Sequence, residues 1–152
     1  DLLSGFGIES VDKIIKIVES ASNGEVSAHL GIADGTPVVS IWRLRYAGKI
    51  PIIFSIDTLA RERLPATFTT ADLKGSLFTF LEERCGVRLD HSLATLRSAR
   101  LPEDFGQDVG NHTDSWILME QVIYDREGEA IIYSKDYHHT DYITFHVRRF
   151  RR

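Results

Sequence analysis

Residues 38–59 read VVSIWRLRYAGKIPIIFSIDTL, and they contain two runs rich in β-branched and aromatic residues. Such residues favour extended structure because their side-chain rotamers are restricted. Only residues 47–50 separate the two runs, and a connection of this length is typical of a β-hairpin. This stretch therefore predicts two antiparallel strands, at residues 38–46 and 51–59.

The sequence on both sides of this hairpin predicts further strands and two helices. Apolar residues at spacings of three and four predict a helix over residues 72–84, with Asp72 as its N-cap, and a shorter helix precedes Gly31. Residues 101–115 are polar and are expected to hold one short helix and a loop. Further strands are expected at residues 12–20, 92–100, 116–124, 130–138 and 142–150. Short turns between strands imply antiparallel pairing, so the fold class is α+β.

The composition describes one ordinary domain. The 152 residues are 43% hydrophobic and carry 18 basic and 22 acidic side chains, for a net charge of −4. This charge disfavours nucleic-acid binding by these residues, and the absence of a long apolar run or leader disfavours a membrane or secreted protein. The single cysteine, Cys85, fits a reducing compartment, so a cytoplasmic location is expected. Because Asp1 is not methionine, we expect the chain to be part of a longer polypeptide.

Two arginines in the first strand of the hairpin are the first candidate site. Arg43 and Arg45 alternate with apolar residues, so both side chains lie on one face of the strand. Two neighbouring guanidinium groups repel each other unless an anion or carboxylates lie between them, and their planar geometry suits carboxylate or phosphate. Two interpretations remain open: a solvated sheet face with ion pairs, or an anion-binding site.

The start of the longer helix is a second candidate. Residues 75–78 read GSLF, and backbone N–H groups near a helix N-terminus together with the Ser76 hydroxyl suit an anion. Small polar residues also begin helices as caps alone, so this signal is weak by itself.

Metal binding and catalysis receive little support. His138 and His139 are adjacent on an expected strand and point to opposite faces, so no metal or cofactor is expected. Asp57, Asp136 and Glu120 would act as paired catalytic carboxylates only if the fold brought two of them together, and nothing in the sequence does so. Motifs for a nucleophile, a phosphate loop or a dinucleotide are absent, so no catalytic residue is assigned.

The order of several short motifs resembles that of a known family. These motifs are LGIADGTPV at 30–38, RLR at 43–45, GSLF at 75–78, LEERCGV at 81–87, YD at 124–125, YS at 133–134 and DYITF at 141–145. Their order and spacing resemble the UTRA domain, the effector-binding and dimerisation half of HutC-type regulators in the GntR superfamily of bacterial transcription factors. No single motif is specific, but the series covers residues 30–149.

The resemblance implies a chorismate-lyase-like antiparallel sheet with flanking helices and no catalytic activity. It also implies a homodimer that binds a small metabolite and acts on DNA only through a winged helix-turn-helix domain N-terminal to this chain. The effector-binding residues that the resemblance implies come from three strands and one helix start: Arg43, Arg45, Ser55, Ser76, Leu77, Phe78, Ile132, Ser134 and His138.

Some of these positions depart from the family pattern. Members that recognise amino-sugar phosphates usually carry glutamates where Ser55 and Ile132 stand, and tyrosines where Phe78 and His138 stand. These changes remove carboxylates and hydroxyls that would bind a sugar. The sequence therefore predicts an anionic, partly apolar effector, a carboxylate or a phosphorylated metabolite, and disfavours a hexosamine phosphate.

Two other functions remain as alternatives. The same fold could support an enzyme acting on an aromatic carboxylate, with His138 as the acid or base, since fold does not fix function. The domain could also be a dimerisation module that binds no ligand.

Overall fold

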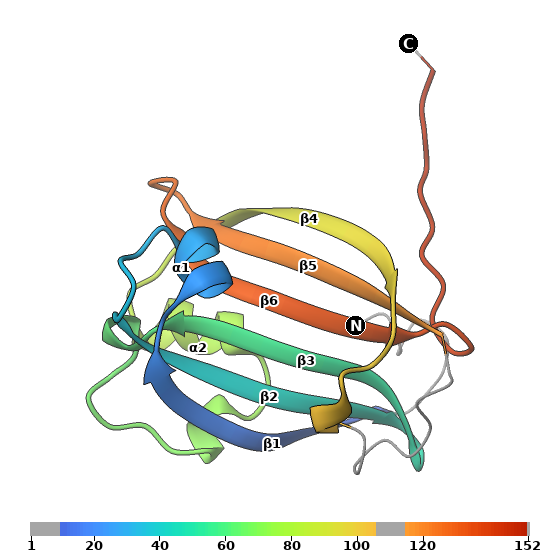
Figure 1. Ribbon diagram of the computed structural model, residues 1–152, viewed down its shortest axis with the longest axis horizontal. Coiled ribbons are helices and arrows are strands. Elements are labelled where there is room, and N and C mark those ends of the chain that lie inside the picture. The colour runs from blue at the N-terminus through green and yellow to red at the C-terminus, as the bar shows by residue number, and fades with distance from the viewer. Residues whose placement is uncertain (1–9, 106–114, 152) are drawn as a thin grey trace.

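A six-stranded antiparallel sheet forms the centre of the molecule (Figure 1). The computed structural model describes residues 10–105 and 115–151. The strands lie in the order β1-β2-β3-β6-β5-β4, which confirms the α+β class. The strands are β1 (Ser10–Ala21), β2 (Pro37–Ala47), β3 (Ile50–Ala60), β4 (Leu89–Ala99), β5 (Trp116–Asp125) and β6 (Ala130–His139). The helices of the described residues are α1 (Gly24–Leu30) and α2 (Leu77–Arg84), with 3₁₀ turns η2 (Arg61–Arg63), η3 (Ala71–Leu73) and η4 (Glu103–Phe105).

The predicted hairpin is confirmed. Strands β2 and β3 pair along their length, with Arg43 opposite Ser55, and the chain turns between them at Gly48. The predicted short helix before Gly31 is also confirmed as α1. Gly31 adopts a left-handed conformation at φ 63°, which interrupts the right-handed helix, and glycine adopts this conformation without the strain that a side chain would cause.

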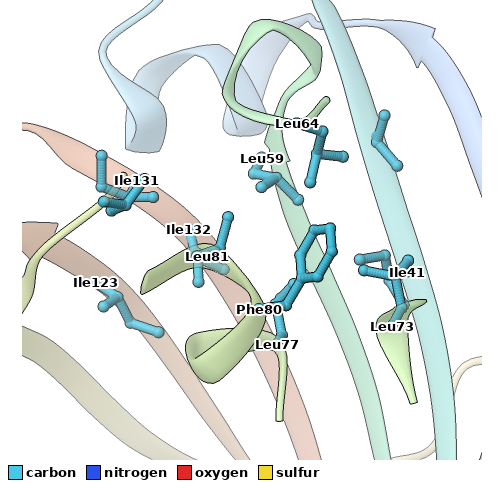
Figure 2. Close-up of a cluster of buried hydrophobic side chains, with 12 residues drawn as sticks. Ile41, Leu59, Leu64, Leu73, Leu77, Phe80, Leu81, Ile123, Ile131 and Ile132 are labelled. Atoms are coloured by element: carbon cyan, nitrogen blue, oxygen red, sulfur yellow. The ribbon is translucent and has the colours of Figure 1, made fainter. Parts of the chain in front are cut away.

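The two helices cover opposite faces of the sheet. Alternation along the strands places Ile41, Leu59 and Ile132 on one face, where α2 packs on them through Leu77, Phe80 and Leu81. Figure 2 shows this cluster, in which the helix side chains point toward the apolar ends of the strands. On the other face, Leu30 at the end of α1 packs with Val38, Val122 and Tyr133. Both faces of one end of the sheet are therefore buried.

The longer helix begins later than its apolar spacing predicts. Gly75 has φ 88°, a conformation incompatible with a continuous helix, so α2 starts at Leu77. Asp72 lies in η3 instead, where its carboxylate accepts a hydrogen bond from Thr69 N at 2.8 Å and pairs with Arg84 at 3.0 Å. The prediction of one helix over residues 72–84 is therefore wrong in its first turn.

The predicted last strand, residues 142–150, is absent from the sheet. Both edges of β6 are already occupied, by β3 and β5, so a segment that follows β6 cannot pair beside it. Residues after Ile143 instead form an extended segment that leads away from the sheet (Figure 1), and Phe150 is 83% exposed.

The remaining expectations about helices and strands are confirmed where the structure describes them. The strand expected at 92–100 is the edge strand β4, and the short helix expected in residues 101–115 is η4. Positions 106–114 of that region lie outside the described residues. Within the described residues, no helix combines the length and apolar character needed to cross a membrane.

Candidate functional site

One face of the sheet changes from apolar to polar halfway along its strands. On β2, Ile41 is followed at the next positions of the same face by Arg43 and Arg45. On β3, Leu59 gives way in the same manner to Asp57 and Ser55, which lies opposite Arg43. The register between the strands therefore gathers the polar ends of neighbouring strands into one patch.

A cavity of about 240 Å³ lies in this patch, and we name it the arginine cavity. Its walls come from four neighbouring strands, β1, β2, β3 and β6, which lie in this order in the sheet. The lining residues are Asp12, Arg43, Arg45, Ile53, Ser55, Asp57, Asp136 and His138. The cavity thus combines two cationic side chains, three carboxylates, a hydroxyl and an imidazole.

Arg43 is the most buried cation of the cavity, at 9% exposure. Its Nη1 donates to the Gly75 carbonyl at 2.7 Å and its Nη2 donates to the Leu73 carbonyl at 2.9 Å. These two bonds attach the end of η3 and the segment that leads to α2 to strand β2. Arg43 also lines a neighbouring hollow of about 390 Å³ together with Lys13, Thr70 and Lys74 among others.

Asp12 on β1 lies within ion-pair distance of both arginines. Its Oδ2 is 3.8 Å from Arg43 Nη1 and 3.6 Å from Arg45 Nη2. The Arg45 and Asp12 side chains are each about one-third exposed, which weakens this pair through solvent screening. Of the two interpretations of the arginine pair, ion pairing with a carboxylate is present, and both guanidinium groups also line a cavity.

Two carboxylates that the sequence did not connect lie in the same cavity. Ser55 pairs with Asp136 and Asp57 pairs with Ser134 across β3 and β6, so the two aspartates are diagonal neighbours on one face. The Ser134 hydroxyl donates a short hydrogen bond to Asp57, and Gln121 Nε2 donates to Asp136 at 3.4 Å. Burial and the nearby Asp136 charge raise the pKa of Asp57 to about 6, and burial also raises the pKa of Asp136.

This pair changes the chemistry expected from the sequence. The replacement of family glutamates at Ser55 and Ile132 predicts a site without strand carboxylates, whereas Asp57 and Asp136 supply two. The alternation of side chains along each strand could have identified these two aspartates. Asp57 is two residues from Ser55, and Asp136 is two residues from both Ser134 and His138, so each shares a face with residues expected at the site.

His138 closes the cavity on β6. Its side chain is buried, its ring meets the Phe145 ring edge-on at 4.9 Å, and burial holds the pKa of the imidazole below its usual range. At neutral pH this side chain is therefore an uncharged polar wall of the cavity.

The expected residues from the start of the longer helix lie outside the arginine cavity. Ser76 is the N-cap of α2, where its hydroxyl accepts a hydrogen bond from Thr79 N at 3.3 Å. Leu77 and Ile132 are buried in the core cluster of Figure 2. Phe78 is 44% exposed and lines a separate hollow of about 320 Å³ with Glu82, His91 and Gln121 among others. The arginine pair and the start of the longer helix are connected through Gly75, whose carbonyl accepts a hydrogen bond from Arg43 and which lines the neighbouring 390 Å³ hollow with it.

Of the nine residues expected from the sequence, four line the cavity: Arg43, Arg45, Ser55 and His138. Ser134 contacts it through Asp57. In the part of the chain that the structure describes, no group of three or more His, Cys, Asp or Glu side chains is arranged to hold a metal ion.

Comparisons with known proteins agree with this architecture. The model of the UTRA domain matches residues 7–144. The structure of PhnF from Mycobacterium smegmatis superposes with a TM-score of 0.85 at 18% identity, covering 98% of this chain and 66% of that chain. A GntR-family transcriptional regulator from Bacillus cereus gives 0.82 at 23% identity, covering 93% of this chain and 99% of that one. A GntR-family regulator from Enterococcus faecalis V583 gives 0.81 at 16% identity, covering 91% and 100%.

Proposed function

Because the chain belongs to the UTRA domain family, we propose that it is the effector-binding domain of a GntR-family, HutC-type transcriptional regulator. In this proposal the arginine cavity binds a small metabolite through a carboxylate or phosphate group, without catalysis and without a cofactor. The domain is cytoplasmic, and it acts on DNA through a winged helix-turn-helix domain elsewhere in the same polypeptide.

The observation that carries the proposal is the position of the two guanidinium groups at one cavity. Arg43 and Arg45 lie on one face of β2, and both line the arginine cavity. A guanidinium group binds carboxylate or phosphate with two parallel hydrogen bonds, and burial strengthens such bonds. Asp12 is the carboxylate that now pairs with both arginines, so an incoming anion would compete with Asp12 for them.

Arg43 offers a route from the cavity to the rest of the molecule. The same guanidinium that faces the cavity holds the carbonyls of Leu73 and Gly75. An anion that draws Arg43 toward the cavity weakens these two bonds and shifts the position of the segment before α2. Effector binding and the arrangement of α2 are then coupled, and this coupling is reciprocal.

Dimerisation is assigned to the edge strand β4. Nearly all of β4 is exposed, with Leu93 70% and Leu96 51% exposed on opposite faces of the strand. An exposed edge strand with apolar side chains favours pairing with another strand, and two copies of β4 can pair about a two-fold axis. We expect Leu93→Lys combined with Leu96→Lys to convert a dimer into a monomer in light-scattering measurements, and a dimer of the double variant would contradict this assignment.

Calorimetry and thermal melting with short-chain alkyl phosphates and carboxylates test the anion site. The native chain is expected to bind a member of this panel and to melt at a higher temperature in its presence. Replacing both Arg43 and Arg45 with alanine should abolish this stabilisation, whereas Arg88→Ala, at an exposed position outside the cavity, should preserve it. Equal stabilisation of the double variant and the native chain would overturn the proposal.

A further inference from the structure

The lining of the arginine cavity holds more carboxylates than guanidinium groups, which disfavours a ligand that is only an anion. Two guanidinium groups face three carboxylates, those of Asp12, Asp57 and Asp136. With all groups ionised, the described lining residues carry one excess negative charge. A purely anionic ligand would increase this excess in a partly buried site, where uncompensated charge is costly.

The carboxylates are also not equivalent. Asp12 is within ion-pair distance of both arginines. Asp57 and Asp136 receive hydrogen bonds from neutral groups, the Ser134 hydroxyl and the Gln121 amide, and the pKa of each stays raised although the arginine charges act to lower it. Burial and the Asp136 charge keep the pKa of Asp57 raised even with Arg43 nearby, so a further positive charge placed between the two carboxylates of this cavity would be favourable.

The strand order separates the two kinds of charge across the cavity. Arg43 and Arg45 lie on β2, whereas Asp57 and Asp136 lie on the next two strands, β3 and β6. Neighbouring strands are about 4.8 Å apart, so the arginine side and the carboxylate side are separated by roughly 5 to 10 Å. This distance suits a short molecule that carries opposite charges at its two ends.

We propose that the ligand of the arginine cavity is a small zwitterion, with its carboxylate or phosphate bound by Arg43 and Arg45 and its ammonium group bound by Asp57 and Asp136. This inference rests on the proposed function, because it extends the same anion site by a second subsite. Neither the resemblance nor the replaced glutamate positions assigns this subsite, since Asp57 and Asp136 lie at other positions.

Two matched series of compounds test the ammonium subsite by calorimetry at neutral pH. One series is 2-aminoethyl phosphate, 2-hydroxyethyl phosphate and propyl phosphate; the other is 4-aminobutanoate, 4-hydroxybutanoate and pentanoate. In each series the anion and the length are kept while the far end changes from ammonium to hydroxyl to methyl. We expect the amino compound of at least one series to bind about tenfold or more tighter than its two partners, since a charge-assisted bond to a buried carboxylate is strong.

Variants separate this inference from the proposed function. Asp136→Asn and Asp57→Asn should weaken the binding of the amino compound and leave the binding of propyl phosphate or pentanoate unchanged or tighter. The matched control Asp34→Asn, at an exposed loop position, should leave the affinity for every compound unchanged. Arg45→Ala should weaken every compound. If the methyl or hydroxyl compounds bind as tightly as the amino compounds, or if no amino compound binds, the inference of a zwitterionic ligand is wrong. If binding survives Arg45→Ala unchanged, the anion site itself is wrong.

Discussion

Two halves of one sheet face differ in what their side chains do. In the half under α2, Ile41, Leu59 and Ile132 are fully buried in an apolar cluster (Figure 2). In the other half the same strands carry Arg43 and Asp136 around an open cavity. The pairing of β2 with β3 runs through both halves, with a register shift only beyond Arg45, so one backbone frame carries an apolar half that packs against α2 and a polar half that lines the cavity.

The largest expected effect comes from placing a carboxylate, like those of the cavity, in the apolar half of the sheet face. Ile132 is completely buried against α2, and Ile132→Asp would place a carboxylate there without a partner. We expect a loss of about 4 kcal/mol or more in the free energy of unfolding, measured by urea denaturation. Ile132→Val is the matched control and should cost only about 1 kcal/mol. If the Ile132→Asp variant folds with native stability, the apolar half tolerates a carboxylate and does not differ from the polar half as described.

The next effect tests the connection between the halves. Arg43→Met removes the hydrogen bonds to the Leu73 and Gly75 carbonyls while keeping a long side chain. We expect a loss of about 2 kcal/mol and faster amide hydrogen exchange in the segment before α2, since bonds to a charged donor are strong. Arg45→Met is the matched control on the same face of β2, and it should leave the exchange of this segment unchanged because the hydrogen bonds to the Leu73 and Gly75 carbonyls come from Arg43. Equal exchange in both variants would show that Arg43 does not hold the segment.

A smaller effect concerns the pH dependence of stability. The pKa of Asp57 is about 6 in the folded state and near its ordinary value of 3.8 when unfolded, so between these values the folded chain holds a proton that the unfolded chain has released. The contribution of Asp57 to stability therefore decreases as the pH rises from about 4 to about 6. Asp57→Asn should stabilise the chain at pH 7 by on the order of 1 kcal/mol, with the difference disappearing near pH 4. Thermal melts across this range measure it, and a pH-independent difference would contradict it.

The smallest expected effect tests whether Ser76 stabilises α2 or takes part in the arginine cavity. Ser76→Ala removes the N-cap of α2 and should cost about 1 kcal/mol in thermal or urea unfolding. Because Ser76 lies outside the arginine cavity, ligand-induced stabilisation should remain unchanged. A loss of ligand binding in this variant would show that Ser76 belongs to the effector site, as the resemblance implies.

The sequence predicted most of the fold because its signals are local. Alternation and β-branched residues identified the strands, and Gly31 identified the end of α1. The errors occurred where local signals compete: the apolar spacing of residues 72–84 continued through Gly75, whose conformation interrupts the helix. The alternating residues 142–150 resemble a strand, but no edge of β6 remains to receive them.

The site was predictable only in part. Arg43 and Arg45 are two residues apart on one strand, so their common face follows from the sequence. Asp57 and Ser134 are 77 positions apart, and their contact depends on the pairing of β3 with β6. That pairing joins strands that are distant in the sequence, and no local turn fixes its register.

The sequence by itself therefore determined the strands of the sheet apart from the incorrect one at 142–150, the α+β class and the arginine pair, since each depends on neighbours within a few residues. Only the tertiary structure decided which polar residues share a cavity. It brought Asp57 and Asp136 beside the arginines and placed Ser76 and Phe78 elsewhere. The physical reason is that side-chain proximity across a sheet is set by strand order and register, which come from burial of the whole apolar face rather than from any single segment.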